Sequence, residues 1–135
     1  AILAAAANAP APRTLVQATC AMASAHVGTL LSQASEWRAL LFLERRISSP
    51  ATYREIYCEY VALFRSALVA ASDWPAGLDP ERAAFNAFSI VDAMAKQGLL
   101  VQDVCPDADE LVADVVCAVT GYLQAAQGAA GAVRA

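Results

Sequence analysis

The stretch from residue 49 to residue 73 constrains the fold most, because it concentrates a large apolar load on one side of a helix. Ser49 can cap a first turn, and Pro50 suits the first helical position, where its missing N–H would have had no partner. The apolar positions after Pro50 recur every three or four residues, which is the spacing of one helical face. They are Tyr53, Ile56, Tyr57, Tyr60, Val61, Phe64, Ala67, Leu68 and Ala71. Aromatic side chains on this face need cover, so the rest of the chain must supply elements that pack on this helix.

Prolines, glycines and capping residues divide the remaining sequence into further amphipathic segments. The clearest helix start is Asp79 followed by Pro80, and the clearest stop is Gly98. These breaks predict additional helices over residues 1–8, 12–33, 36–47, 80–97 and 106–124, and a frayed tail over residues 128–135. The first of these segments is short, and it reads as the end of a helix. The sequence therefore predicts an all-α bundle of about five substantial helices with short connections.

Composition narrows the class of protein. A chain of 135 residues with 59% hydrophobic residues fits one globular domain with a real core. A formal net charge of −4 argues against a nucleic-acid-binding surface on these residues. No apolar run approaches the roughly 18 residues that a membrane span needs, so we expect no membrane partner. The cysteines lack a C-x-x-C spacing and indicate reduced, mostly buried thiols in a cytoplasmic protein, with a disulfide as the less favoured alternative: Cys20, Cys58, Cys105 and Cys117.

The helix predicted over residues 80–97 is apolar around more than half of its circumference. One side carries Ala84, Phe85, Phe88, Val91 and Ala95, and the other carries Ala87, Ile90 and Met94. A helix of this kind usually packs on two sides. We therefore expect one side to serve the core of this chain and the other to meet a second partner.

Several polar residues lie on otherwise apolar stripes and are candidates for a ligand site. His26, the only histidine, is either a satisfied core imidazole or a polar anchor for a ligand. The aromatic residues of the 49–73 helix can serve the core or a pocket, and Trp37 is assigned to the core. Asn86 and Ser89 either face solvent or point into the same pocket. The candidate ligand-binding set is Met22, His26, Tyr57, Tyr60, Phe64, Asn86 and Ser89.

Catalysis has little support in the sequence. Cys20 and His26 are six residues apart, so they point in different directions on a helix, and no third group is evident. No histidine and carboxylate spacing typical of a helical metal site occurs, and no glycine-rich phosphate loop is present. We therefore expect no catalytic residues, no metal and no cofactor.

Two blocks resemble a known family. Residues 37–46, followed by Ser49, Pro50 and the aromatic helix, resemble the C-terminal domain of TetR-type transcriptional regulators. So do residues 79–84 with the apolar helix that ends at residues 96–99, and the acidic start of the helix over residues 106–124. The resemblance covers nearly the whole chain, and it depends on helix lengths and breaks more than on fixed residues.

The resemblance implies a ligand-responsive regulator, of the repressor type, that acts as a homodimer. Residues 1–8 would end a helix connecting to an N-terminal DNA-binding domain that is absent from this sequence, so DNA would be a partner only through that domain. Residues 9–127 would bind a small, largely apolar effector and dimerise through the last two helices as a four-helix bundle. The expected interface residues are Phe85, Phe88, Val91, Asp92, Val112, Val115, Val116, Val119 and Tyr122.

Two alternatives stay open at this point. One is a helical association module without a ligand, and the less favoured one is a small helical-bundle enzyme. A cavity lined by His26 and tyrosines would favour the effector reading. A fully packed interior would favour association, and bound metal with carboxylate ligands would favour an enzyme.

Overall fold

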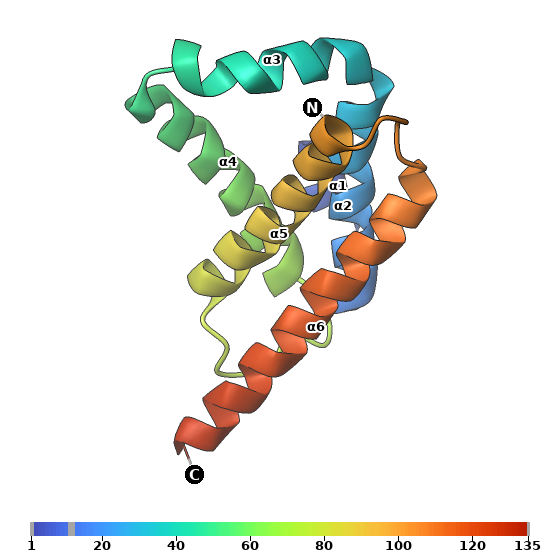
Figure 1. The fold of residues 1–135 in the computed structure, drawn as a ribbon. Helices are drawn as coiled ribbons and strands as arrows, with labels where there is room; N and C mark the ends of the chain where they lie inside the picture. The colour runs from blue at the N-terminus through green and yellow to red at the C-terminus, as the bar shows by residue number, and fades with distance from the viewer. Residues whose placement is uncertain (1, 11–12, 135) are drawn as a thin grey trace.

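The computed structural model describes residues 2–10 and 13–134, with the side chains at positions 45, 133 and 134 outside that description. These residues form six helices and no strand (Figure 1). The helices are α1 (Ile2–Ala7), α2 (Leu15–Ser32), α3 (Ala34–Ile47), α4 (Pro50–Val69), α5 (Pro80–Val101) and α6 (Ala108–Arg134). Five long helices and a short first one confirm the predicted all-α class.

Capping side chains fix three helix starts, two at the predicted places and the third two residues after the predicted start at residue 106. The Ser49 hydroxyl accepts a hydrogen bond from the backbone N–H of Thr52 at 3.2 Å, at the start of α4. Asp79 accepts the backbone N–H of Glu81 at 3.0 Å, at the start of α5. Asp107 accepts two backbone N–H groups from the first turn of α6. Each cap satisfies helix donors that would otherwise lack a partner.

Two helix boundaries near the N-terminal half differ from the prediction. The predicted start at Pro12 lies outside the described residues, and α2 begins at Leu15 because Thr14 caps its first turn. Helix α4 ends at Val69, before the predicted end at Asp73. The Asp73 carboxylate instead accepts the backbone N–H of Leu15 at 2.6 Å and so joins the loop after α4 to the start of α2.

Helices α5 and α6 are longer than the sequence predicts. Gly98 lies inside α5 rather than ending it, since it packs close to Pro106 and Leu111 at the start of α6. Residues 128–134, predicted to fray, continue α6, where alanine supports the helix and outweighs the cost of the glycines. The last turns of α6 extend beyond the other helices (Figure 1).

The core lies where α2, α4, α5 and α6 meet, and α1 closes one side of it. Phe64, Phe88 and Met22 are its largest fully buried side chains. Helix α3 lies across one end of the bundle (Figure 1), and none of its described side chains is buried. The core thus depends on five helices, while α3 rests against α2 and α5.

The core also contains residues that the sequence assigns to a dimer interface. Phe88, Val91, Val115 and Val119 are at most 1% exposed within the single chain, and Asp92 is buried as well. They fill the core of this chain, so they leave no surface for a second copy. The assignment failed because periodicity identifies an apolar face without identifying what covers it. Of the remaining interface candidates, Phe85 is exposed and Val112, Val116 and Tyr122 are half-buried.

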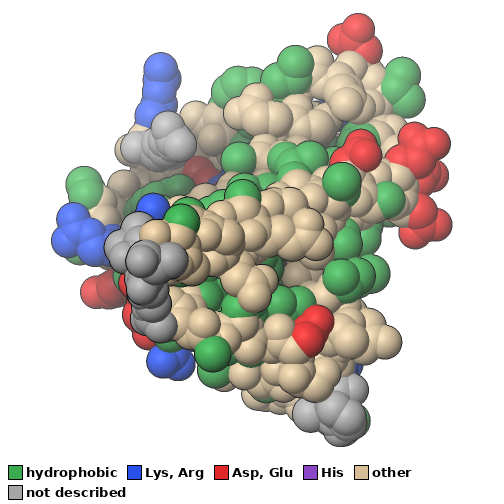
Figure 2. Space-filling model, turned by 90° about the horizontal axis from the view of Figure 1, so that it is seen from below, with side chains coloured by type: hydrophobic (Ala, Val, Ile, Leu, Met, Phe, Trp, Pro, Cys, Tyr) green, Lys and Arg blue, Asp and Glu red, His purple; other side chains and the backbone are tan. Residues whose placement is uncertain are grey.

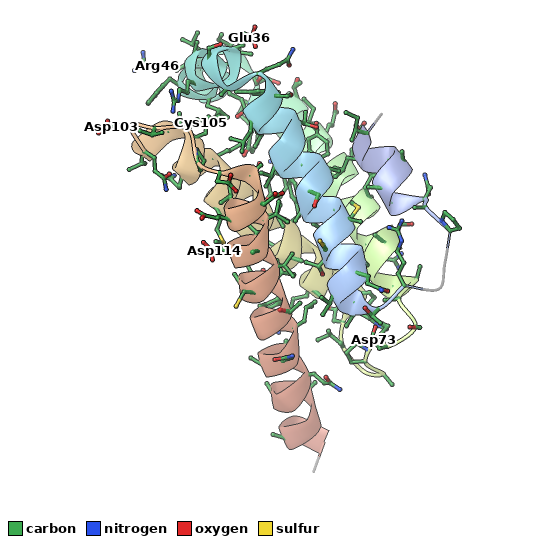
Figure 3. All side chains as sticks on the ribbon, turned by 90° about the vertical axis from the view of Figure 1, so that its right-hand side faces the viewer. Glu36, Arg46, Asp73, Asp103, Cys105 and Asp114 are labelled. Carbon is green, nitrogen blue, oxygen red and sulfur yellow. The ribbon has the colours of Figure 1, made fainter. Side chains whose placement is uncertain are left out.

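The cysteines are free, as predicted, but all four are exposed instead of buried. Cys20, Cys58 and Cys117 lie on the outward faces of their helices, and Cys105 lies in the loop between α5 and α6 (Figure 3). Their surface positions exclude the predicted role as core residues.

The described surface is mixed in character. On the face seen in Figure 2, apolar side chains are spread among scattered charged ones, and the described residues of this face form no large basic patch. In the described ranges, no helix combines the length and the apolar content that crossing a membrane requires.

Candidate ligand-binding cleft

A cleft of about 440 Å³ lies between α1, α2, α3, α4 and α5. Its volume falls in the usual range for small-molecule sites, roughly 300–1,000 Å³. Its walls are mostly apolar, with polar or charged side chains from α2, α3 and α5. The lining residues are Ile2, Leu3, Ala25, His26, Thr29, Leu30, Trp37, Glu44, Ile56, Tyr60, Asp92 and Lys96.

The charged side chains of the cleft and His26 form one connected cluster. His26 donates from Nε2 to Oδ1 of Asp92 at 3.0 Å. Lys96, one turn later on α5, places Nζ 3.0 Å from Oδ2 of Asp92 and 3.5 Å from Oε2 of Glu44. The cluster therefore joins α2, α5 and α3.

Asp92 and Lys96 are both charged at neutral pH. Burial alone would raise the pKa of Asp92, but the hydrogen bond from His26 and the charge of Lys96 outweigh it and hold this pKa below its usual value. Burial alone would lower the pKa of Lys96, but the charge and hydrogen bond of Asp92 and the charge of Glu44 raise it above its usual value. Mutual attraction thus compensates for the cost of desolvating two charges.

Two aromatic rings pack against the His26 side chain of this cluster. The ring of His26 meets the ring of Phe88 edge-on, with centroids 5.5 Å apart, and that of Tyr60 at 6.1 Å. Phe88 is fully buried, whereas Tyr60 is 38% exposed and lines the cleft. The imidazole is consequently fixed by packing on one side and by Asp92 on the other.

The structure brings two of the predicted ligand residues to the cleft. His26 and Tyr60 line it, as the sequence analysis anticipates for a pocket. Met22 and Phe64 do not, since both are fully buried in the core. These two side chains are apolar members of a helix stripe, for which core packing is the ordinary role.

The other three candidates bond to neighbouring helices instead. Ser89 donates to the carbonyl of Phe85 at 2.7 Å, so its oxygen accepts the Tyr57 hydroxyl at 2.6 Å. Asn86 donates to the hydroxyl of Tyr122 at 2.8 Å. These bonds tie α5 to α4 and to α6, and none of the three predicted residues lines the cleft.

Ten of the twelve lining residues were not predicted as ligand residues, and four of these ten carry aromatic or charged side chains. Trp37 was assigned to the core, and it does pack against buried residues of α2 and α5 as well as lining the cleft. Asp92 was assigned to a dimer interface, while Glu44 and Lys96 were given no role in a site. One signal was available for two of them. Asp92 and Lys96 are four residues apart on a strongly apolar helix, a spacing that places opposite charges together on one face.

A second depression lies outside the cleft. It is broader, about 870 Å³, and more open, and it follows α4 and the start of α5. Its charged side chains include Arg65 and Glu81, which pair with each other. Because the cleft is more enclosed and brings polar and charged side chains together from three helices, it is the candidate site.

The described residues provide no candidate metal centre, and the chain matches no known family. The described residues contain no group of three or more His, Cys, Asp or Glu side chains that could hold a metal ion. Comparison of the chain with protein-family models, curated proteins and solved structures finds no match. The function is therefore argued from the cleft itself.

Proposed function

We propose that this chain is the effector-binding and dimerisation domain of a ligand-responsive transcriptional regulator of the TetR type, acting in the cytoplasm. The observation that carries the proposal is the cleft with its mostly apolar walls and its His26–Asp92–Lys96 cluster. Apolar walls with a few fixed polar groups are the usual composition of small-molecule sites. The sequence resemblance supports the regulatory role.

The position of α1 gives the proposal a mechanism. Ile2 and Leu3 line the cleft, and Leu3 also packs in the core. A ligand that touches these residues would favour one placement of α1 over another. Under the proposal, α1 leads to a DNA-binding domain outside these 135 residues, and the ligand acts by binding the two placements with different affinity.

The proposal includes a homodimer, through a face of α6 other than the one the sequence analysis chose. Gly121, Gly128 and Gly131 lie inside α6, and a Cβ added at any of them would meet nothing within 4 Å. Each glycine in a helix interior costs about 1 kcal/mol relative to alanine. Close approach of a second copy would explain why α6 contains these glycines, which the packing of the single chain does not require.

Binding is preferred to catalysis because of the groups that line the cleft. The lining residues that the structure describes include no serine or cysteine, and the Thr29 hydroxyl donates to the carbonyl of Ala25 at 2.8 Å. His26 and Lys96 are both engaged with Asp92. An association module without ligand remains the second candidate, since the α6 glycines would serve it equally well.

The test is binding of the neutral fluorescent dye Nile red to the purified chain. Ala25 is buried and lines the cleft, so Ala25→Phe should fill it and abolish saturable binding. Ala62→Phe is the matched control, because it places the same ring in the open depression beside α4. Equal binding by both variants, or none by the unmodified chain, would contradict a binding role for the cleft.

A further inference from the structure

With His26 counted as neutral, the side chains that line the cleft carry two negative charges and one positive charge. Glu44 and Asp92 are acidic, and Lys96 is the one lysine or arginine among the lining residues that the structure describes. His26 and Lys96 both contact the carboxylate of Asp92, and the Asp92 side chain is 11% exposed. Glu44 is 32% exposed at its side chain, and its contact with Lys96 is longer, at 3.5 Å. The uncompensated negative charge therefore resides at Glu44.

An anionic ligand would meet this cluster unfavourably. Lys96 already lies between two carboxylates, so an incoming carboxylate or phosphate would have to displace Glu44 from it. Displacement would leave Glu44 without its partner and place a second negative charge beside Asp92. A cation, by contrast, can approach Glu44 without separating Lys96 from Asp92.

The cleft also contains aromatic rings and apolar side chains that would contact such a cation. Trp37 and Tyr60 line the same cleft as Glu44. Indole and phenol rings attract ammonium groups through their faces, by about 0.5–2 kcal/mol depending on desolvation. The remaining wall is apolar and would accept a hydrocarbon body: Ile2, Leu3, Ala25, Leu30 and Ile56.

We infer that the ligand of the cleft is a cation with an apolar body, a protonated amine or a quaternary ammonium compound, held by Glu44 and by the rings of Trp37 and Tyr60. This inference depends on the proposed function, because it assigns a chemical class to the effector of the same site. It narrows the largely apolar effector expected from the sequence to one with a positive head group.

The experiment compares three probes that share one apolar body. They are 4-phenylbutylammonium, 4-phenylbutanol and 4-phenylbutanoate, titrated into the unmodified chain by calorimetry at neutral pH. We expect the ammonium compound to bind about tenfold more tightly than the alcohol, and the carboxylate to bind most weakly. An alcohol or carboxylate that binds as tightly as the amine would overturn the inference while leaving a binding role intact.

Variants then locate the selectivity. Glu44→Gln should remove most of the preference for the amine over the alcohol. Glu59→Gln makes the same change of charge at an exposed position of α4 outside the cleft lining, and should keep the preference. Equal effects of the two variants would refute the role of Glu44.

A second pair of variants tests the aromatic contribution. Tyr60→Phe keeps the ring and should retain the preference for the amine, whereas Tyr60→Leu should reduce it. An unchanged preference in Tyr60→Leu would count against the ring contact. Failure of all three probes to bind the unmodified chain would contradict the proposed function itself, and the inference with it.

Discussion

Asp92 shows at the residue scale how one buried carboxylate can organise a site. It accepts a hydrogen bond from His26 on α2 and pairs with Lys96 on its own helix. Removing one member of a buried charged set costs more than the set contributes, because the partners stay desolvated without compensation. Asp92 is therefore both a wall of the cleft and a connection between helices.

The first prediction concerns this carboxylate. Asp92→Asn should lower the free energy of unfolding at pH 7 by about 2 kcal/mol. Because folding lowers the pKa of Asp92, its contribution is present above the unfolded value, near 3.8, and disappears as the pH falls through the folded value. Urea unfolding of both proteins from pH 7 to pH 2 should therefore show a difference that shrinks below about pH 4.

The control for this prediction is Asp114→Asn on the exposed face of α6, where the side chain points away from the bundle (Figure 3). It should change stability little at any pH. A deficit in Asp92→Asn that is constant from pH 7 to pH 2 would show that shape, and not charge, explains the loss.

Residue roles were only partly predictable. His26 could be recognised as a polar residue on an apolar stripe, which must find a partner or a ligand. Its partner could not, because Asp92 lies 66 residues away in the sequence and meets it only through the packing of α2 on α5. Side chains from separate helices converge according to helix placement, which periodicity does not specify.

At the scale of single elements, glycines inside helices can distinguish a helix that packs only within its own chain from a helix that also meets a second copy. Gly28 in α2 and Gly121 in α6 both have open space where a Cβ would be. The two positions thus look alike within one chain, and they differ only if α6 meets a second copy.

The corresponding prediction compares two identical substitutions. Gly28→Ala should raise the free energy of unfolding by about 0.5–1 kcal/mol, because alanine restricts the unfolded chain and meets no obstacle. Gly121→Ala should instead raise the dimer dissociation constant about tenfold, measured by sedimentation equilibrium, since the methyl group separates the paired helices. Equal stabilisation by both variants at every protein concentration would contradict a dimer through this face.

Helix starts were more predictable than helix ends, for a physical reason. A start depends on a side chain beside it in the sequence, as Ser49 and Asp79 show. An end depends on what the last turn meets. Helix α5 continues past Gly98 because α6 packs against it, and Arg38 of α3 donates to the carbonyls of Leu99 and Gln102 at its C-terminal end.

For the whole molecule, the central fact is that the apolar face of α5 packs inside its own chain. Phe88 lies among four aromatic rings, with centroid distances of 4.8–5.6 Å: those of His26, Tyr57, Tyr60 and Phe64. The sequence pattern was enough to predict this apolar face and the all-α class. It could not decide between a core and an interface, because both bury the same apolar stripe.

The last prediction follows from this placement. Phe88→Ala should lower the free energy of unfolding by about 3–5 kcal/mol, since it leaves a cavity that the surrounding rings cannot fill. That is a large part of the roughly 5–15 kcal/mol that stabilises a typical domain. Phe42→Ala, at a ring that is 70% exposed, should cost less than about 1 kcal/mol.

Urea unfolding followed by circular dichroism measures both variants. Unchanged stability in Phe88→Ala, together with dissociation of a dimer, would return this residue to the interface that the sequence first suggests.

Helix α3 forms a side of the cleft that lies outside the main core. Trp37, Leu40, Glu44 and Ile47 fall on one stripe of this helix, and two of them line the cleft. Leu40 and Ile47 remain exposed beside them. Trp37 packs against Val27, Leu30 and Ala95, and Arg38 donates to the carbonyl of Leu99, so these contacts hold α3 against α2 and α5. The main core contains no side chain of α3. A ligand too wide for the cleft would therefore have to break the contacts of α3, while the packing of the other five helices would stay intact.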